Sequence, residues 1–240
     1  MIKPFKVRIC ESELIDLKVR IRNTRWPDEI ENSGWKYGTN LSYLKTLAEY
    51  WEMEFNWWKI EQKINSYPNF IATIDKIKIH FIHAKAKNKN ATPLIITHGW
   101  PGSFLEMLKL IDILTMMDFD VIVPSIPGFS FSDKVNTDGV NYGFVAELWH
   151  KLMTNLGYSH YGVQGGDIGA GISIKLCQMH PENIIGLHLN YISDSYQPYL
   201  KPNEKLDKEV LDYKSFVNDW NAKEGAYALI HSTKPLSLAY

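Results

Sequence analysis

Residues 161–170, with the sequence Tyr-Gly-Val-Gln-Gly-Gly-Asp-Ile-Gly-Ala, decide the fold of this chain. The first four have the character of a short buried strand, and an apolar helix pattern begins at Ile168. Between the two elements, glycines at 165, 166 and 169 leave room for a sharp turn in which backbones come close together. Asp167 occupies the tip of that turn. The stretch therefore predicts a strand, a tight turn and a helix, with a carboxylate projecting where the helix begins.

A second loop follows an earlier apolar run. Residues 93–97 have the pattern of a buried parallel strand, and His-Gly-Trp-Pro-Gly-Ser at 98–103 comes directly after it. Strand and helix patterns alternate around the two loops, with strands expected over 70–74, 77–83, 94–97, 121–123, 161–164 and 184–189 and helices over 104–116, 144–156 and 168–179. Such alternation is typical of an α/β protein with a mostly parallel sheet and helices on both faces. Ligands of such sheets bind at the carboxyl ends of the strands, where both loops fall.

The chain divides into three predicted parts. Residues 1–68 form an N-terminal helical arm, residues 69–194 form the α/β core, and residues 195–240 begin an inserted cap, where the alternation breaks. The arm pattern predicts a helix over 11–23 and one or two helices over 41–64. Five of the eight tryptophans fall in the first quarter of the chain, and we interpret them as structural residues that fill gaps between the arm and the core.

Composition limits the class of protein. A chain of 240 residues with 45% hydrophobic residues and a net charge of −1 is typical of one globular domain, and it indicates neither a nucleic-acid partner nor an acidic membrane partner. Cys10 and Cys177 match neither a disulfide framework nor a metal site, which favours a reducing compartment. The N-terminus lacks an apolar signal core, and no apolar run reaches the roughly 18 residues of a membrane span. We therefore expect a cytoplasmic protein with no membrane span, metal or cofactor.

The turn at Asp167 has the features of a nucleophile elbow. Such a turn needs small residues on both sides of the reacting group, and the three glycines supply them. The dipole and free N–H groups of the helix that follows favour an ionised carboxylate. In this arrangement the loop at 98–103 and the residue after the nucleophile each give one backbone N–H to an oxyanion hole, so Trp100 and Ile168 are the expected donors. His98 is interpreted as a brace for its loop rather than as a catalytic base.

Two other interpretations of the glycine-rich turn are open. The turn could merely reverse the chain, or it could bind a dinucleotide. The dinucleotide fingerprint requires glycine, any residue, glycine, two further residues and glycine. Glycines at 162, 165, 166 and 169 do not give that spacing, which favours the elbow.

Motifs along nearly the whole chain resemble one known family, the microsomal-type epoxide hydrolases with a long N-terminal arm, which include the juvenile hormone epoxide hydrolases. The motifs preserve the family's order. They are Thr-Arg-Trp-Pro-Asp-Glu at 24–29, Gly-Trp-Lys-Tyr-Gly at 34–38, Phe-Ile-His at 81–83, Thr-His-Gly-Trp-Pro-Gly-Ser at 97–103, Pro-Ser-Ile-Pro-Gly-Phe-Ser-Phe-Ser-Asp at 124–133, Gln-Gly-Gly-Asp at 164–167, Gly-Leu-His-Leu-Asn at 186–190 and Thr-Lys-Pro at 233–235. The resemblance implies an α/β-hydrolase fold.

The resemblance also implies a two-step conversion of an epoxide to a vicinal diol without a cofactor. Asp167 matches the aspartate that attacks an epoxide carbon and forms an ester. Tyr227 matches a cap tyrosine that protonates the epoxide oxygen, a role suited to a neutral phenol. A histidine oriented by a carboxylate then activates water. The side chains expected to line a pocket for an apolar or aryl-substituted epoxide are Trp100, Phe104, Phe129, Phe131 and Ile168.

The chain departs from the family pattern in three respects. Ala170 stands where a serine is common, which we interpret as a neutral change. Ile168 stands where many members carry a tryptophan. Family members also continue well beyond Tyr240, and that remainder normally completes the cap and the last core strands and supplies the second tyrosine, the acid and the histidine. None of the eight histidines follows a last strand, and Asp194 is interpreted as a structural turn residue. We therefore expect ester formation without efficient ester hydrolysis.

Missing last strands would leave residues 184–189 at an unpaired sheet edge, which invites association. Beside a small-molecule epoxide, the expected partners are therefore a second copy of the chain or a complementing C-terminal fragment. No nucleic acid is expected as a partner.

Other functions are also open. One is an inactive truncated paralogue, or a binding protein that retains the pocket. Another is a haloalkane dehalogenase, although those enzymes typically hold the halide with a tryptophan after the nucleophile, and Ile168 cannot donate that hydrogen bond. A serine esterase is disfavoured because the elbow has no serine at its tip.

Overall fold

The computed structural model describes residues 1–192 and 206–239. The chain separates into two compact units, Met1–Asp194 and Ser195–Tyr240. Asp194, interpreted above as a turn residue, lies outside the described residues. The finer division of the chain into an arm, a core and a cap stays a prediction.

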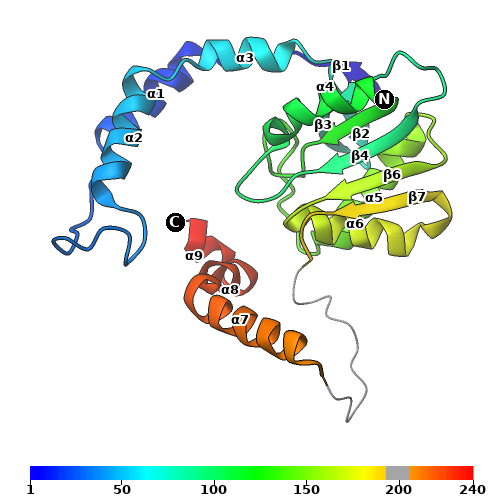
Figure 1. Ribbon diagram of the computed structural model, residues 1–240. Helices are drawn as coiled ribbons and strands as arrows, with labels where there is room; N and C mark the ends of the chain where they lie inside the picture. Colours follow the sequence, from blue (N-terminus) through cyan, green and yellow to red (C-terminus); the bar gives the residue numbers. More distant parts are fainter. Residues whose placement is uncertain (193–205, 240) are drawn as a thin grey trace. The chain divides into compact units, whose positions relative to one another are not determined.

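The described residues form one sheet of seven strands in the order β1-β2-β3-β5-β4-β6-β7 (Figure 1). Strands β5, β4, β6 and β7 run parallel, and β1, β2 and β3 join them through antiparallel pairs. The parallel strands alternate with helices along the chain, as the sequence predicts. The strands are β1 Ile2–Pro4, β2 Asn69–Ile74, β3 Ile77–Ala84, β4 Thr92–Thr97, β5 Phe119–Pro124, β6 Tyr161–Gly165 and β7 Ile184–Leu189.

Helices pack against the sheet and bury two apolar clusters, one on each face. Side chains alternate along each strand, so Ile95 belongs to one cluster and Ile96 to the other. The first cluster includes α5 (Tyr142–Asn155) and α6 (Ile168–Met179), and the second includes the 3₁₀ helix η1 (Phe104–Met107) and α4 (Leu108–Met116). The helices that begin at the two glycine-containing loops, α6 and η1 with α4, therefore pack on opposite faces of the sheet.

The predicted arm, residues 1–68, contains three helices, α1 (Glu11–Arg22), α2 (Leu41–Met53) and α3 (Trp57–Asn65). The sequence predicts one or two helices over 41–64, and the structure has two helices there. The break follows from Asn56, whose side chain accepts a hydrogen bond from the Lys59 amide at 3.2 Å and caps α3. Two hydrogen bonds, each 2.8 Å long, join the Asn65 side chain at the end of α3 to the backbone of Val7, in the segment that follows β1.

The second unit contains α7 (Lys208–Glu224), α8 (Ala226–Thr233) and α9 (Pro235–Ala239). Their helical character agrees with the mixed helical pattern and proline punctuation of this region. Across the described ranges, no helix combines the length and the apolar character that crossing a membrane would require.

Candidate active site

Asp167 lies at the predicted elbow, between the end of β6 and the start of α6. Its backbone angles are φ 53° and ψ −131°, a region that residues with a side chain rarely adopt. Such a conformation costs about 1–3 kcal/mol and persists only where the surroundings impose it. The side chain is exposed. The backbone therefore holds the carboxylate away from the sheet and at the helix N-terminus.

Glycines allow the strained turn to form. A Cβ at Gly165 would collide with the carbonyl of Gly169 and with the Ser173 hydroxyl. A Cβ at Gly169 would collide with the carbonyl oxygens of Thr97 and His98. The turn is therefore packed directly against the loop that leaves β4, and only glycine fits at these contacts.

The loop at 98–103 delivers a hydrogen-bond donor to the elbow. The backbone N–H of Trp100 donates to Asp167 Oδ1 at 2.8 Å. Gly99 makes this approach possible, because a Cβ there would lie 2.5 Å from the Asp167 Cβ. Ile168 is the first residue of α6, so its N–H is among the amides without an acceptor inside the helix. The Trp100 amide thus contacts the carboxylate, and the oxyanion-hole role of Trp100 and Ile168 stays a prediction.

His98 is fully buried and connects two loops. Its Nε2 accepts a hydrogen bond from the Ile126 amide at 3.2 Å, so Nδ1 carries the proton and donates to the Gly99 carbonyl at 3.0 Å. Burial lowers the pKa of the imidazole below its ordinary value. This geometry suits the bracing role that the sequence suggested.

A cavity of about 330 Å³ opens beside Asp167. It contains a second carboxylate, from Glu106 on η1. The residues that line the cavity are Gly99, Trp100, Pro101, Gly102, Glu106, Met107, Gly166, Asp167, Asn190 and Tyr191.

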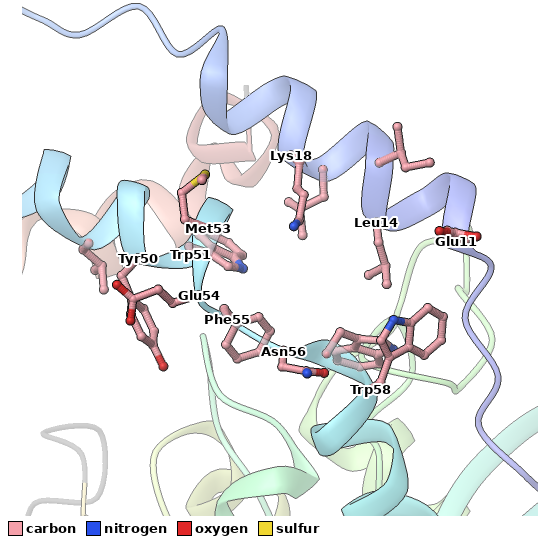
Figure 2. Close-up of a pocket in the computed structure, with 14 residues that line it drawn as sticks. Glu11, Leu14, Lys18, Tyr50, Trp51, Met53, Glu54, Phe55, Asn56 and Trp58 are labelled. Atoms are coloured by element: carbon pink, nitrogen blue, oxygen red, sulfur yellow. The ribbon is translucent and has the colours of Figure 1, made fainter.

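A larger cavity, of about 780 Å³, lies within the arm between α1 and residues 47–58 (Figure 2). Figure 2 shows Leu14 and Lys18 extending from α1 into it, with Phe55 and Trp58 on the other side. None of the predicted site residues lies among the described residues that line it. The chemistry predicted from the sequence therefore points to the smaller cavity.

Comparison with known families matches two stretches of the chain. Residues 2–107 match the family described as epoxide hydrolase N terminus. Residues 92–226, more than half of the chain, match the family described as alpha/beta hydrolase fold. The chain belongs to the α/β-hydrolase fold family. This match confirms the predicted fold class.

Individual proteins that are similar to the chain are named epoxide hydrolases. Epoxide hydrolase 1 from Oryctolagus cuniculus is 42% identical to the chain. The alignment is 260 positions long with its gaps and covers 98% of this chain and 57% of the relative. The structure of Aspergillus niger epoxide hydrolase matches with a TM-score of 0.87 and 29% identity over 99% of this chain and 64% of that one. The juvenile hormone epoxide hydrolase from Bombyx mori matches with a TM-score of 0.74 and 37% identity over 79% and 53% of the two chains. The predicted resemblance to epoxide hydrolases is confirmed, and the chain spans between half and two thirds of these relatives.

The three phenylalanines predicted to line the pocket lie elsewhere in this α/β-hydrolase chain. Phe104 is buried and packs edge-on against His80 with a centroid distance of 4.8 Å, and Phe131 packs against the same ring at 5.2 Å. Phe129 lies against His98 at 5.2 Å. None of the three is among the described residues lining the cavity beside Asp167. Their role in the substrate pocket stays a prediction.

Tyr227, the predicted proton donor, lies on α8 of the second unit and is 45% exposed. Its catalytic role stays a prediction. Among the described residues, no group of three or more His, Cys, Asp or Glu side chains could hold a metal ion.

Asn190 and Glu106 line the cavity, and neither is among the site residues predicted from the sequence. A signal existed for Asn190, because it follows β7 directly and so falls at the carboxyl end of a parallel strand. For Glu106 the only signal was its place three residues after the glycine-containing loop.

The tryptophans of the arm differ in their surroundings. Trp57 packs against the second core cluster and donates from Nε1 to Glu61 Oε2 at 3.2 Å, as expected of a structural residue. Trp51 and Trp58 line the arm cavity and remain 45% and 43% exposed.

Proposed function

We propose that this chain carries the nucleophilic part of an epoxide hydrolase, with Asp167 as the residue that opens an apolar epoxide. The observation that carries the proposal is the hydrogen bond from the Trp100 amide to Asp167 Oδ1. It fixes one carboxylate oxygen in a backbone donor site and leaves the other, Oδ2, available for attack. Relatives over nearly the whole chain are named epoxide hydrolases.

The reaction would proceed in two steps. Oδ2 attacks an epoxide carbon, the carbon–oxygen bond of the ring breaks, and its electron pair goes to the epoxide oxygen. A phenol, for which Tyr227 is the candidate, protonates that oxygen. Oδ1 becomes the carbonyl oxygen of the new ester.

Hydrolysis of the ester then makes use of the same hydrogen bond. Hydroxide adds to the ester carbon, and the bond from that carbon to the alcohol oxygen then breaks, so that the diol leaves with the proton of the added hydroxyl group and the Asp167 carboxylate is restored. While hydroxide is bound, negative charge develops on Oδ1. The amide of Trp100 already points at that oxygen, so it would stabilise the charge without reorganisation. Ile168 is the second proposed donor. The base that activates water was expected beyond Tyr240, and that expectation stays a prediction, as does the cytoplasmic location.

The test is the intact mass of the chain after incubation with excess styrene oxide, followed by peptide mapping. We expect a mass increase of one epoxide on Asp167, or diol in solution if the ester is hydrolysed. Asp167→Asn and Asp167→Ala should show neither. Asp138→Asn, which removes an exposed loop carboxylate, should react like the unaltered chain.

The same experiment separates the competing functions. A folded chain that yields neither ester nor diol would overturn the proposal and favour a binding protein that retains the pocket. An adduct that persists in both Asp167 variants would also overturn it, because the modified carboxylate would then be a different one.

A further inference from the structure

The loop at 98–103 lies between two carboxylates. Gly99 packs against the Asp167 side chain, and Gly102, three residues later, packs against the carboxylate of Glu106 so closely that a Cβ at Gly102 would collide with Oε1. Glu106 belongs to η1, directly after the loop, and its side chain folds back over it. A carboxylate therefore lies on each side of the loop.

Both carboxylates line the cavity beside Asp167, and the Trp100 amide donates a hydrogen bond to one of them. Among the described residues that line it, none is Lys, Arg or His. Within the described ranges, no salt bridge to Glu106 is present. The remaining wall consists of Trp100, Pro101, Met107 and Tyr191 with glycine backbone and the Asn190 amide. An entering ligand thus meets apolar side chains and two negative charges.

We propose that Glu106 sets the charge preference of the site, so that neutral epoxides react and epoxides bearing a carboxylate are rejected. The inference rests on the proposed function, because it concerns which epoxides reach Asp167. Asp167 must be negative to attack, so its repulsion of an anion is inherent in the chemistry. Glu106 takes no part in bond making, and its charge adds a second repulsion that a neutral substrate does not feel.

Because Glu106 is exposed, water and salt screen its charge, and the effect should be moderate. We expect it to change the ratio of reaction rates by about tenfold, which corresponds to about 1.4 kcal/mol. Added salt should reduce it.

The experiment compares styrene oxide with 4-carboxystyrene oxide, which have the same reacting ring and differ in charge. The measured quantity is the ratio of their rates of ester formation on Asp167, followed by intact mass in the full chain. Using a ratio within each variant cancels general effects on folding or on Asp167. The variants are Glu106→Gln, which removes the charge and keeps the shape, and Glu106→Asp, which keeps the charge.

We expect the neutral-to-anionic ratio to fall about tenfold in Glu106→Gln, to be largely retained in Glu106→Asp, and to fall with added salt in the unaltered chain. Ester formation with an unchanged ratio in Glu106→Gln would overturn the charge preference and leave the proposed function intact. If the folded chain gave neither an ester on Asp167 nor diol from styrene oxide in any variant, the proposed function would be overturned, and this inference with it.

Discussion

At the scale of single residues, the elbow is a close-packed contact between two loops that are far apart in the sequence. Asp167 adopts a positive φ, and Gly169 fills the contact with the backbone that leaves β4. Neither feature could persist without the other, because the strained turn needs a neighbour that holds it in place.

Gly169→Ala should therefore destabilise the chain by about 2–3 kcal/mol, since the new methyl group would overlap the carbonyl oxygens of Thr97 and His98. The measurement is the midpoint of urea unfolding with an unchanged slope. Gly186→Ala is the matched control, because nothing lies within 4 Å of a Cβ at that exposed strand position. Equal midpoints for the two variants would contradict the packing argument.

The sequence predicted the elbow at this scale because glycine has a recognisable steric role. It did not predict where the aromatic side chains point. Phe104, Phe129 and Phe131 follow the two site loops in a way that suited a pocket, yet they turn inward onto His80 and His98. The packing of these rings against buried histidines joins residues that are far apart in the sequence, so no local pattern predicts it.

At the scale of elements, β7 forms an edge of the described sheet and carries exposed apolar side chains. Ile185 is 59% exposed and Leu187 is 41% exposed. The strand itself, Ile184–Leu189, contains no Lys, Glu or Pro of the kind that protects an edge.

Ile185→Lys should reduce self-association of the chain, measured by sedimentation velocity over a concentration series. The lysine removes apolar surface and places a charge on the edge. Asn136→Lys adds the same charge to an exposed loop and serves as the control for net charge. If both variants associate to the same extent as the unaltered chain, the edge of β7 is not the contact.

Most helices and strands were predictable because their apolar periodicity is long enough to read. Two features of the chain are exceptions. β1 has only three residues, Ile2–Pro4, and was missed because it gains its stability from pairing with β2 rather than from its own pattern. The break between α2 and α3 was left open because the cap at Asn56 competes with an apolar stripe that continues through it.

At the scale of the whole molecule, a buried polar network around His80 joins separate parts of the core. Asn69 donates from its amide nitrogen to two backbone carbonyls, so its oxygen must accept from His80 Nε2 at 3.0 Å. Nδ1 then accepts from the Ser125 hydroxyl at 2.9 Å. The network connects β2, β3 and the loop after β5, and it requires a neutral imidazole packed among aromatic rings.

This requirement predicts that stability falls with acidity. Burial lowers the pKa of His80 from 6.5 to about 4. Below pH 6.5 His80 is protonated in the unfolded chain, whereas in the folded chain it stays neutral down to about pH 4. The contribution of His80 to the free energy of unfolding is therefore fully present above pH 6.5 and is lost as the pH falls through this window. The loss from this residue should be about 3 kcal/mol. Burial lowers the pKa values of His83, His98 and His150 in the same direction, so they add to the trend.

The contribution of His80 can be isolated by measuring the free energy of unfolding in urea across this window for the unaltered chain and for His80→Gln. Glutamine keeps an amide donor and acceptor but cannot titrate. The free energy of unfolding of His80→Gln should therefore be lower at neutral pH, and it should fall by about 3 kcal/mol less than that of the unaltered chain between pH 6.5 and 4. His160→Gln changes an exposed histidine and should follow the unaltered chain. Parallel curves for His80→Gln and the unaltered chain would mean that the network accepts the proton in the folded state, and the neutral imidazole would then not be what holds these strands together.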